Sequence, residues 1–152
     1  MLKHIYPEQI ASNVTYSLIG KRAIAGKRLH DLSSYTVIII ADELEDEVLI
    51  KNIADDILTR GCKNIALCGK ASDEMQDIFD QEDREINGFN DITGYEDFAV
   101  TRRFEDIEQL PEEIEMCWNE VLVICGDMSL LRECQSIIEE SFLGSVTIEF
   151  KV

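Results

Sequence analysis

Short hydrophobic segments recur along the chain, and the clearest of them is Tyr35–Ala41. This segment is apolar on both of its faces and rich in β-branched residues, which is typical of a strand covered on both sides in a parallel sheet. Asn64–Cys68 and Glu120–Cys125 have the same character, and a glycine follows each of them. We expect a further strand at Phe98–Thr101. The alternation of apolar and polar residues in Ser145–Lys151 predicts a final edge strand with one wet face.

Helical periodicity fills the intervals between these strands. Apolar residues recur at helical spacing in about 44–60, where Gly61 provides a C-cap. A second helix is expected after Ser72, which is placed to cap it. A third is expected over about 105–117, and a fourth with Ser129 as its N-cap. The polar stretch 80–97 is interpreted as a surface loop.

The first 34 residues carry the weakest pattern. Pro7 is suited to a first helical turn, and Ile10, Val14 and Leu18 recur on one helical face, so a helix is expected there. The basic segment Gly20–Arg28 does not have the glycine spacing of a phosphate-binding loop, and no Ser or Thr follows Lys27. A surface connection or a helix end is the preferred interpretation.

Alternation of strands and helices predicts an α/β fold. We expect a Rossmann-like or flavodoxin-like three-layer sandwich, with a mostly parallel sheet of about five strands and helices on both faces. The expected domain organisation is a single α/β domain of residues 1–152, in which 1–34 form a helical, basic extension packed on 35–152. Folds of this kind host many functions, so the architecture alone names none.

The charge of the chain narrows the choice of partners. The chain holds 31 acidic and 14 basic residues, with a formal net charge of −17. The acidic excess follows residue 34, because five basic and two acidic residues lie before that point. Such a body repels nucleic acid and anionic lipid surfaces, since binding to phosphate depends on Lys and Arg. It would attract a basic protein, although keeping the protein soluble is an equally simple explanation of the same charge.

Acidic residues gather where the predicted strands end. At the carboxyl edge of the sheet, where open α/β folds usually keep their sites, we place Asp42, Glu43, Glu45, Asp46, Asp73, Glu74 and Asp127. They can stabilise helix N-termini, or they can contact a partner. A metal site of receiver or Toprim type is not predicted. A receiver-type site needs an acceptor aspartate at the end of a middle strand and a lysine near the end of a late strand, and both are missing. A Toprim-type site needs an Asp-x-Asp at one strand end, and the segment at Asp127 has no second acid.

Motifs for catalysis and cofactors are missing from the sequence. There is no Gly-x-Gly-x-x-Gly after the first strand and no Gly-x-Ser-x-Gly. The turn at Gly69-Lys70 has weak anion-binding character, and a plain tight turn is the preferred interpretation. The five cysteines do not have zinc-ligand spacing, and their odd number argues against a disulfide framework, so we interpret them as small core residues. We therefore expect neither enzymatic activity nor a cofactor nor a bound metal.

The N-terminal sequence has no apolar stretch of signal-peptide length, so a cytoplasmic protein without membrane contact is expected. In size, acidity and lack of catalytic motifs, the chain resembles bacterial immunity proteins. This resemblance concerns the general character of the class, and no sequence motif supports it. The first hypothesis is thus an immunity or antitoxin protein that neutralises a basic nuclease toxin by direct binding. One alternative is a divergent Rossmannoid domain that binds a nucleotide or a metal through Asp42, Asp127 and Gly69-Lys70. Another is a structural subunit that pairs through Val146–Phe150.

Overall fold

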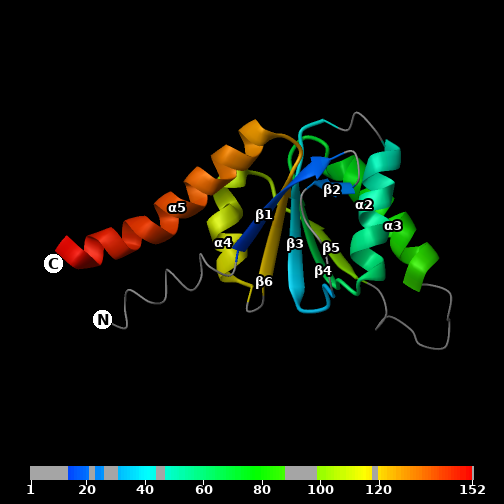
Figure 1. Ribbon diagram of the computed structural model, residues 1–152, viewed down its shortest axis with the longest axis horizontal. Helices are drawn as coiled ribbons and strands as arrows, with labels where there is room; N and C mark the ends of the chain where they lie inside the picture. The colour runs from blue at the N-terminus through cyan, green and yellow to red at the C-terminus, as the bar shows by residue number, and fades with distance from the viewer. Residues whose placement is uncertain are drawn as a thin grey trace.

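A six-stranded sheet forms the centre of the molecule in the computed structural model, which describes residues 14–20, 23–25, 31–43, 47–87, 99–117 and 120–151 (Figure 1). The strand order is β2-β1-β6-β3-β4-β5. All neighbouring strands are parallel except β2, which pairs antiparallel with β1. The strands are β1 (Val14–Gly20), β2 (Ala23–Ala25), β3 (Tyr35–Ile40), β4 (Asn64–Cys68), β5 (Val100–Arg103) and β6 (Glu120–Cys125).

Helices cover both faces of this sheet, which confirms the expected α/β sandwich (Figure 1). From β3 the chain runs outward through β4 to β5 and then returns to place β6 on the other side of β3. The chain direction across the sheet therefore reverses between β3 and β6. The helices are α2 (Glu47–Thr59) and α3 (Ser72–Asn87) on one face, and α4 (Leu110–Glu115) and α5 (Met128–Lys151) on the other, with a short 3-10 helix (Ile107–Gln109) before α4.

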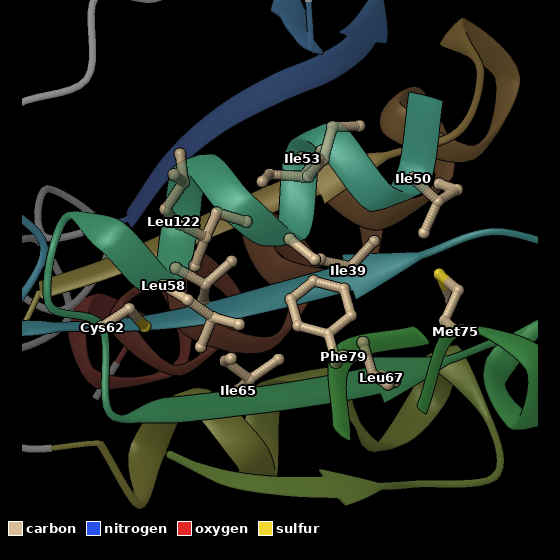
Figure 2. Close-up of a cluster of buried hydrophobic side chains, with 14 of the residues drawn as sticks. Ile39, Ile50, Ile53, Leu58, Cys62, Ile65, Leu67, Met75, Phe79 and Leu122 are labelled. Carbon is tan, nitrogen blue, oxygen red and sulfur yellow. The ribbon is translucent and has the colours of Figure 1, made fainter. Parts of the chain in front are cut away.

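The two faces of the sheet are buried in two separate hydrophobic clusters. Alternate residues of β3 enter them: Val37 and Ile39 point toward α2 and α3, whereas Ile38 and Ile40 point toward α4 and α5. In Figure 2 the ring of Phe79, from α3, lies among apolar side chains of β3, β4 and α2. This packing explains why β3 contains hydrophobic residues at consecutive positions, as the sequence predicts.

Residues 14–20 form a strand, so the helix expected there is wrong for Val14 and Leu18. β1 pairs with β6, with Val14 opposite Val121, and it joins the sheet instead of forming a packed extension. A spacing of four residues fits one helical turn and also two strand repeats, so the apolar positions alone did not distinguish the two. Ala23–Ala25 is also a strand, although that segment was expected to be a connection or a helix end. Residues 1–13 lie outside the described residues.

The final edge strand is also wrong, because α5 continues through Ser145–Lys151 to the end of the described chain. Three alternating apolar residues do not specify a strand unless a neighbouring strand accepts their backbone hydrogen bonds. A continuing helix satisfies those backbone groups within its own segment. The alternative in which Val146–Phe150 serves as an edge for strand pairing thereby loses its basis.

The interpretation of 80–97 as a loop is wrong for its first part, since α3 extends to Asn87. Glu82 and Asp83 occupy buried positions of this helix. Because these two residues are charged, they interrupt the apolar periodicity by which a helix is identified in a sequence. The following strand is β5, two residues later than expected, and residues 88–98 are outside the described part. The guanidinium group of Arg102 forms an ion pair with Glu113, and that of Arg103 forms one with Asp73.

None of the helices in the described ranges combines the length and apolar character that crossing a bilayer requires.

Candidate functional site

Exposed carboxylates gather at the carboxyl edge of the sheet. Five parallel strands end at this edge, and four of them, β3 to β6, are followed by exposed acidic residues. We call this group the acidic rim: Asp42 and Glu43 after β3, Asp73 and Glu74 at the start of α3, Glu105 and Asp106 after β5, and Asp127 after β6. The cationic side chains described next to these residues are Lys70, in the turn before α3, and Arg103, the last residue of β5, which is already paired with Asp73. The rim therefore presents excess negative charge to solvent.

Backbone contacts around Ala41 hold three of these loops together. The N–H of Ala41 donates to the Cys68 carbonyl oxygen over 3.1 Å, and the Ala41 carbonyl accepts the N–H of Ala71 over 3.2 Å. On the side of β3 that faces β6, the N–H of Gly126 donates to the Ile40 carbonyl oxygen over 2.9 Å. The loops after β3, β4 and β6 are thus joined by main-chain hydrogen bonds, which gives the rim a rigid base.

Two residues of the acidic rim have a structural role as well. Oδ1 of Asp42 accepts the N–H of Lys70 at 3.2 Å and so closes the turn before α3. Oδ1 of Asp127 accepts the N–H of Leu130 at 2.9 Å, which is the contact of an N-cap residue. Asp127 therefore caps α5, and the expectation that Ser129 caps it is wrong.

The structure brings most of the predicted site residues to one edge. Asp42, Glu43, Asp73, Glu74 and Asp127 are all exposed there, whereas Glu45 and Asp46 lie outside the described residues. The role of all seven predicted residues in partner binding stays a prediction.

The sequence interpretation missed Glu105 and Asp106, because it ended the preceding strand at Thr101. Oε1 of Gln109 accepts the N–H groups of both residues, which fixes this loop at the rim. The acidic pair that follows β5 was the signal in the sequence, and it becomes a rim feature only once β5 is placed at Val100–Arg103.

A cleft opens beside the rim, between the start of α3 and the end of β5. Its volume is about 530 Å³, within the usual range for small-ligand sites, and it is lined by Gly69, Ser72, Gln76, Arg103, Phe104 and Glu105. Two of its polar side chains are engaged within the protein. Gln76 donates to the Thr101 carbonyl oxygen over 3.3 Å, and Arg103 pairs with Asp73. A ligand would have to compete with these contacts.

The turn at Gly69-Lys70 is poorly suited to a phosphate. Three consecutive N–H groups that an anion would need are used internally: that of Lys70 by Asp42, that of Ala71 by Ala41, and that of Ser72 by Gly69. A phosphate at the start of α3 would have to displace them. This arrangement agrees with a plain tight turn.

Metal ligands do not converge within the ranges that the structure describes, where no three His, Cys, Asp or Glu side chains are grouped for a metal ion. Asp42 and Asp127, the two ligands of the metal hypothesis, are each engaged in a hydrogen bond that caps a turn or a helix. The residues described at this edge therefore do not favour a divalent cation.

A perturbed carboxyl group lies away from the rim, between α2 and α3. Glu82 is 3% exposed, and its pKa is raised to about 7 by burial first, then by a hydrogen bond to Asp55 and by the negative charges of Asp55 and Glu85. Nζ of Lys51 lies 3.7 Å from Oε1 of Glu82 and opposes this effect. Strongly shifted groups often mark functional sites, but this one is packed between two helices rather than in a cleft. We interpret it as a structural element.

Exposed hydrophobic side chains do not select one edge as an interface. Val48 and Met128 are exposed at the starts of α2 and α5, close to the rim, while Val100 and Met116 are exposed toward the opposite edge. Apolar exposure therefore does not distinguish the carboxyl edge from the opposite one.

Comparison of the chain with known protein families and with curated proteins gives no match. The fold and the candidate site by themselves define the class of this protein. It is an α/β sandwich of Rossmann-like type with an acidic carboxyl edge.

Proposed function

We propose that this protein is a non-catalytic binding domain that recognises a basic protein through its acidic rim. In its most concrete form it is an immunity protein that neutralises a cationic nuclease toxin by covering the cleft that binds nucleic acid. The observation that carries the proposal is the convergence, on one edge of the sheet, of exposed carboxylates that follow four separate strands.

Electrostatics supports this kind of partner. A net charge of −17 attracts a cationic protein and raises the association rate, and the exposed carboxylates of the rim would contact it at the carboxyl edge. The nucleic-acid cleft of a nuclease is basic because it binds phosphate, so it is complementary to such an edge. The rigid base under the rim also limits the ordering that binding requires, since three of its loops are already joined by backbone hydrogen bonds.

The experiment is a capture of partners from the native host at low salt, followed by elution at high salt and mass spectrometry. Support requires a basic protein whose nuclease activity is inhibited by stoichiometric addition of this protein. A captured protein without such inhibition would not support the immunity function. Recovery of nucleic acid or of no basic partner would contradict it.

Charge-matched variants test whether the rim is the surface involved. Glu43, Glu74 and Glu105 are exposed and have no side-chain partner among the described residues, so a triple Glu→Gln variant removes charge without removing a cap. The control replaces Glu112, Glu115 and Glu120, which are exposed on α4 and at the start of β6, toward the opposite edge. We expect the rim variant to associate about tenfold more slowly with the captured partner, with a weaker dependence on salt. Equal effects of both variants would show that net charge, not the rim, drives binding.

The cleft beside the rim favours a second candidate function, the binding of a small anionic molecule. Arg103 is its cation, and a ligand carboxylate or phosphate would replace Asp73 as its partner. The test is a thermal-shift screen of nucleotides and small carboxylates against the wild type and Arg103→Gln. A ligand that raises the melting temperature of the wild type alone would support this function, and the lack of any such ligand would exclude it.

A further inference from the structure

Two buried cysteines lie in contact beneath the start of α5. The Sγ atoms of Cys125, the last residue of β6, and Cys134, on α5, are 3.9 Å apart. Both side chains are fully buried in the cluster between the sheet and α4 and α5. The fold therefore holds two sulfur atoms next to each other, away from solvent.

The topology explains why these residues meet. In β6, Val121, Val123 and Cys125 point to the face covered by α4 and α5, and Cys125 is the last of them. The chain then turns at Gly126 and Asp127 and returns over the same face as α5, which buries Cys134 and Ile138 one helical turn apart. The loop between the two cysteines is short, so the pairing is local.

The other cysteines do not share this arrangement. All five are described, and none of them is in a disulfide bond. The thiol of Cys62 donates to the carbonyl oxygens of Tyr35 and Asn64, and that of Cys117 donates to the carbonyl of Glu113 over 3.2 Å. Among the five, a contact between two sulfur atoms is recorded only for Cys125 and Cys134.

The contact makes the two thiols chemically unequal. The S–H of Cys125 donates to Sγ of Cys134. This hydrogen bond lowers the pKa of Cys134, although burial opposes it. The same hydrogen bond, together with burial, raises the pKa of Cys125. Cys134 is therefore the thiol of the two that ionises more readily, and the thiolate is the reactive form.

We propose that Cys125 and Cys134 form an oxidisable dithiol, which a peroxide converts into an intramolecular disulfide. The Cys134 thiolate attacks one peroxide oxygen and breaks the O–O bond, which gives a sulfenic acid and, after protonation, one water. The Cys125 sulfur then attacks the sulfenic sulfur, and the hydroxyl leaves as a second water with the proton of Cys125. Two thiols are oxidised, one molecule of hydrogen peroxide is reduced, and a reducing dithiol restores the starting state. The burial of both sulfurs favours a small oxidant over a bulky disulfide.

Disulfide formation requires a local movement. The sulfurs must approach from 3.9 Å to the bond length of about 2.05 Å. Cys125 is held in the sheet by pairing with both β1 and β3. The movement therefore falls on the first two turns of α5, which begin directly after Asp127.

Peptide mapping of the wild-type protein tests the proposal. Reduced protein is treated with hydrogen peroxide, quenched in acid, unfolded, alkylated with N-ethylmaleimide and digested with trypsin and Glu-C. Cleavage at Glu120, Arg132 and Glu133 separates the two cysteines from each other and from Cys117. We expect the loss of two alkylatable thiols, a mass decrease of about 2 Da in the unalkylated protein, and a dithiothreitol-sensitive link between peptides Val121–Arg132 and Cys134–Glu139.

Matched variants locate the reaction. Cys134→Ser should abolish the linked peptide, whereas Cys62→Ser, which replaces a buried thiol on the other face of the sheet, should keep it. Cys125→Ala provides a second test if Cys134→Ser does not fold. The proposal is overturned if all five thiols remain alkylatable, if Cys134 stops at a sulfinic acid, or if the disulfide joins another pair such as Cys68 and Cys134.

Discussion

Gly69 and Ala41 approach so closely that a Cβ on Gly69 would lie 2.2 Å from the Ala41 carbonyl oxygen. Gly69 also has a φ of +105°, a conformation that residues with a side chain rarely adopt. The turn before α3 can therefore close against the end of β3 only with glycine at this position. This contact supports the base of the acidic rim, since Ala41 accepts the N–H of Ala71.

Gly69→Ala should lower the free energy of unfolding by about 3 kcal/mol or more, because strain at positive φ is added to a backbone clash. Gly61→Ala is the matched control. Gly61 has a φ of +88°, but the nearest atom to an added Cβ there is 3.6 Å away. We expect a loss of about 1 kcal/mol from strain alone. Urea unfolding at equilibrium measures both, and equal losses would show that the contact with Ala41 has no energetic role.

Glu82 should make the stability of this protein decrease as the pH rises from about 4.5 to about 7. Its pKa is raised in the folded state, so the folded state holds the proton more tightly, and the advantage is lost once Glu82 ionises. Glu82→Gln, which stays neutral, should therefore gain stability relative to the wild type as the pH rises from about 4.5 to about 8.

The control for this effect is Glu74→Gln, on the exposed side of the same helix. Its stability relative to the wild type should not follow this pH window. Chemical unfolding at several pH values measures the difference. A constant difference between Glu82→Gln and the wild type would contradict the prediction.

Asp83 should contribute to stability although it is a charged residue in a polar segment. It is 6% exposed, and its carboxylate accepts the side-chain amide of Asn87 at 2.6 Å and the N–H of Ala99 at 3.0 Å. Asp83→Ala leaves the Ala99 N–H without this acceptor, so we expect a loss of about 1–3 kcal/mol. The exposed Asp80 is the control, and its replacement by Ala should cost less than about 0.5 kcal/mol. Thermal or urea unfolding that ranks the two in the opposite order would contradict this role.

Asp127 should separate the structural role of the acidic rim from its proposed binding role. Asp127→Ala removes the acceptor for the Leu130 N–H and should cost about 1 kcal/mol of stability. Asp127→Asn keeps an oxygen acceptor and removes the charge, so its stability should stay close to that of the wild type. If Asn is as destabilising as Ala in urea unfolding, the negative charge at the start of α5, and not the hydrogen bond, is the stabilising feature.

The hydrophobic pattern alone predicts β3, β4 and β6 because these strands are buried on both faces. Each contains consecutive apolar residues, and the bounds expected from the sequence for Asn64–Cys68 and Glu120–Cys125 are those of the structure. Such a pattern is local, so it can be read without knowing which strand lies beside it. The convergence of Asp42, Asp73 and Asp127 on one edge follows in the same way, since parallel strands share a carboxyl edge.

Other features depend on contacts between residues far apart in the chain. Whether Val14 and Leu18 lie in a helix or a strand is decided by pairing with β6, and the backbone of Ser145–Lys151 is helical as the continuation of α5. The burial of Glu82 against Asp55 and the contact of Cys125 with Cys134 likewise arise from helix packing. The sequence by itself thus determined the elements with a strong local period and the acidic character of the carboxyl edge. The tertiary structure decided the strand order, the ends of the sheet and the pairing of buried side chains, because these depend on which distant segments satisfy one another's hydrogen bonds and apolar surfaces.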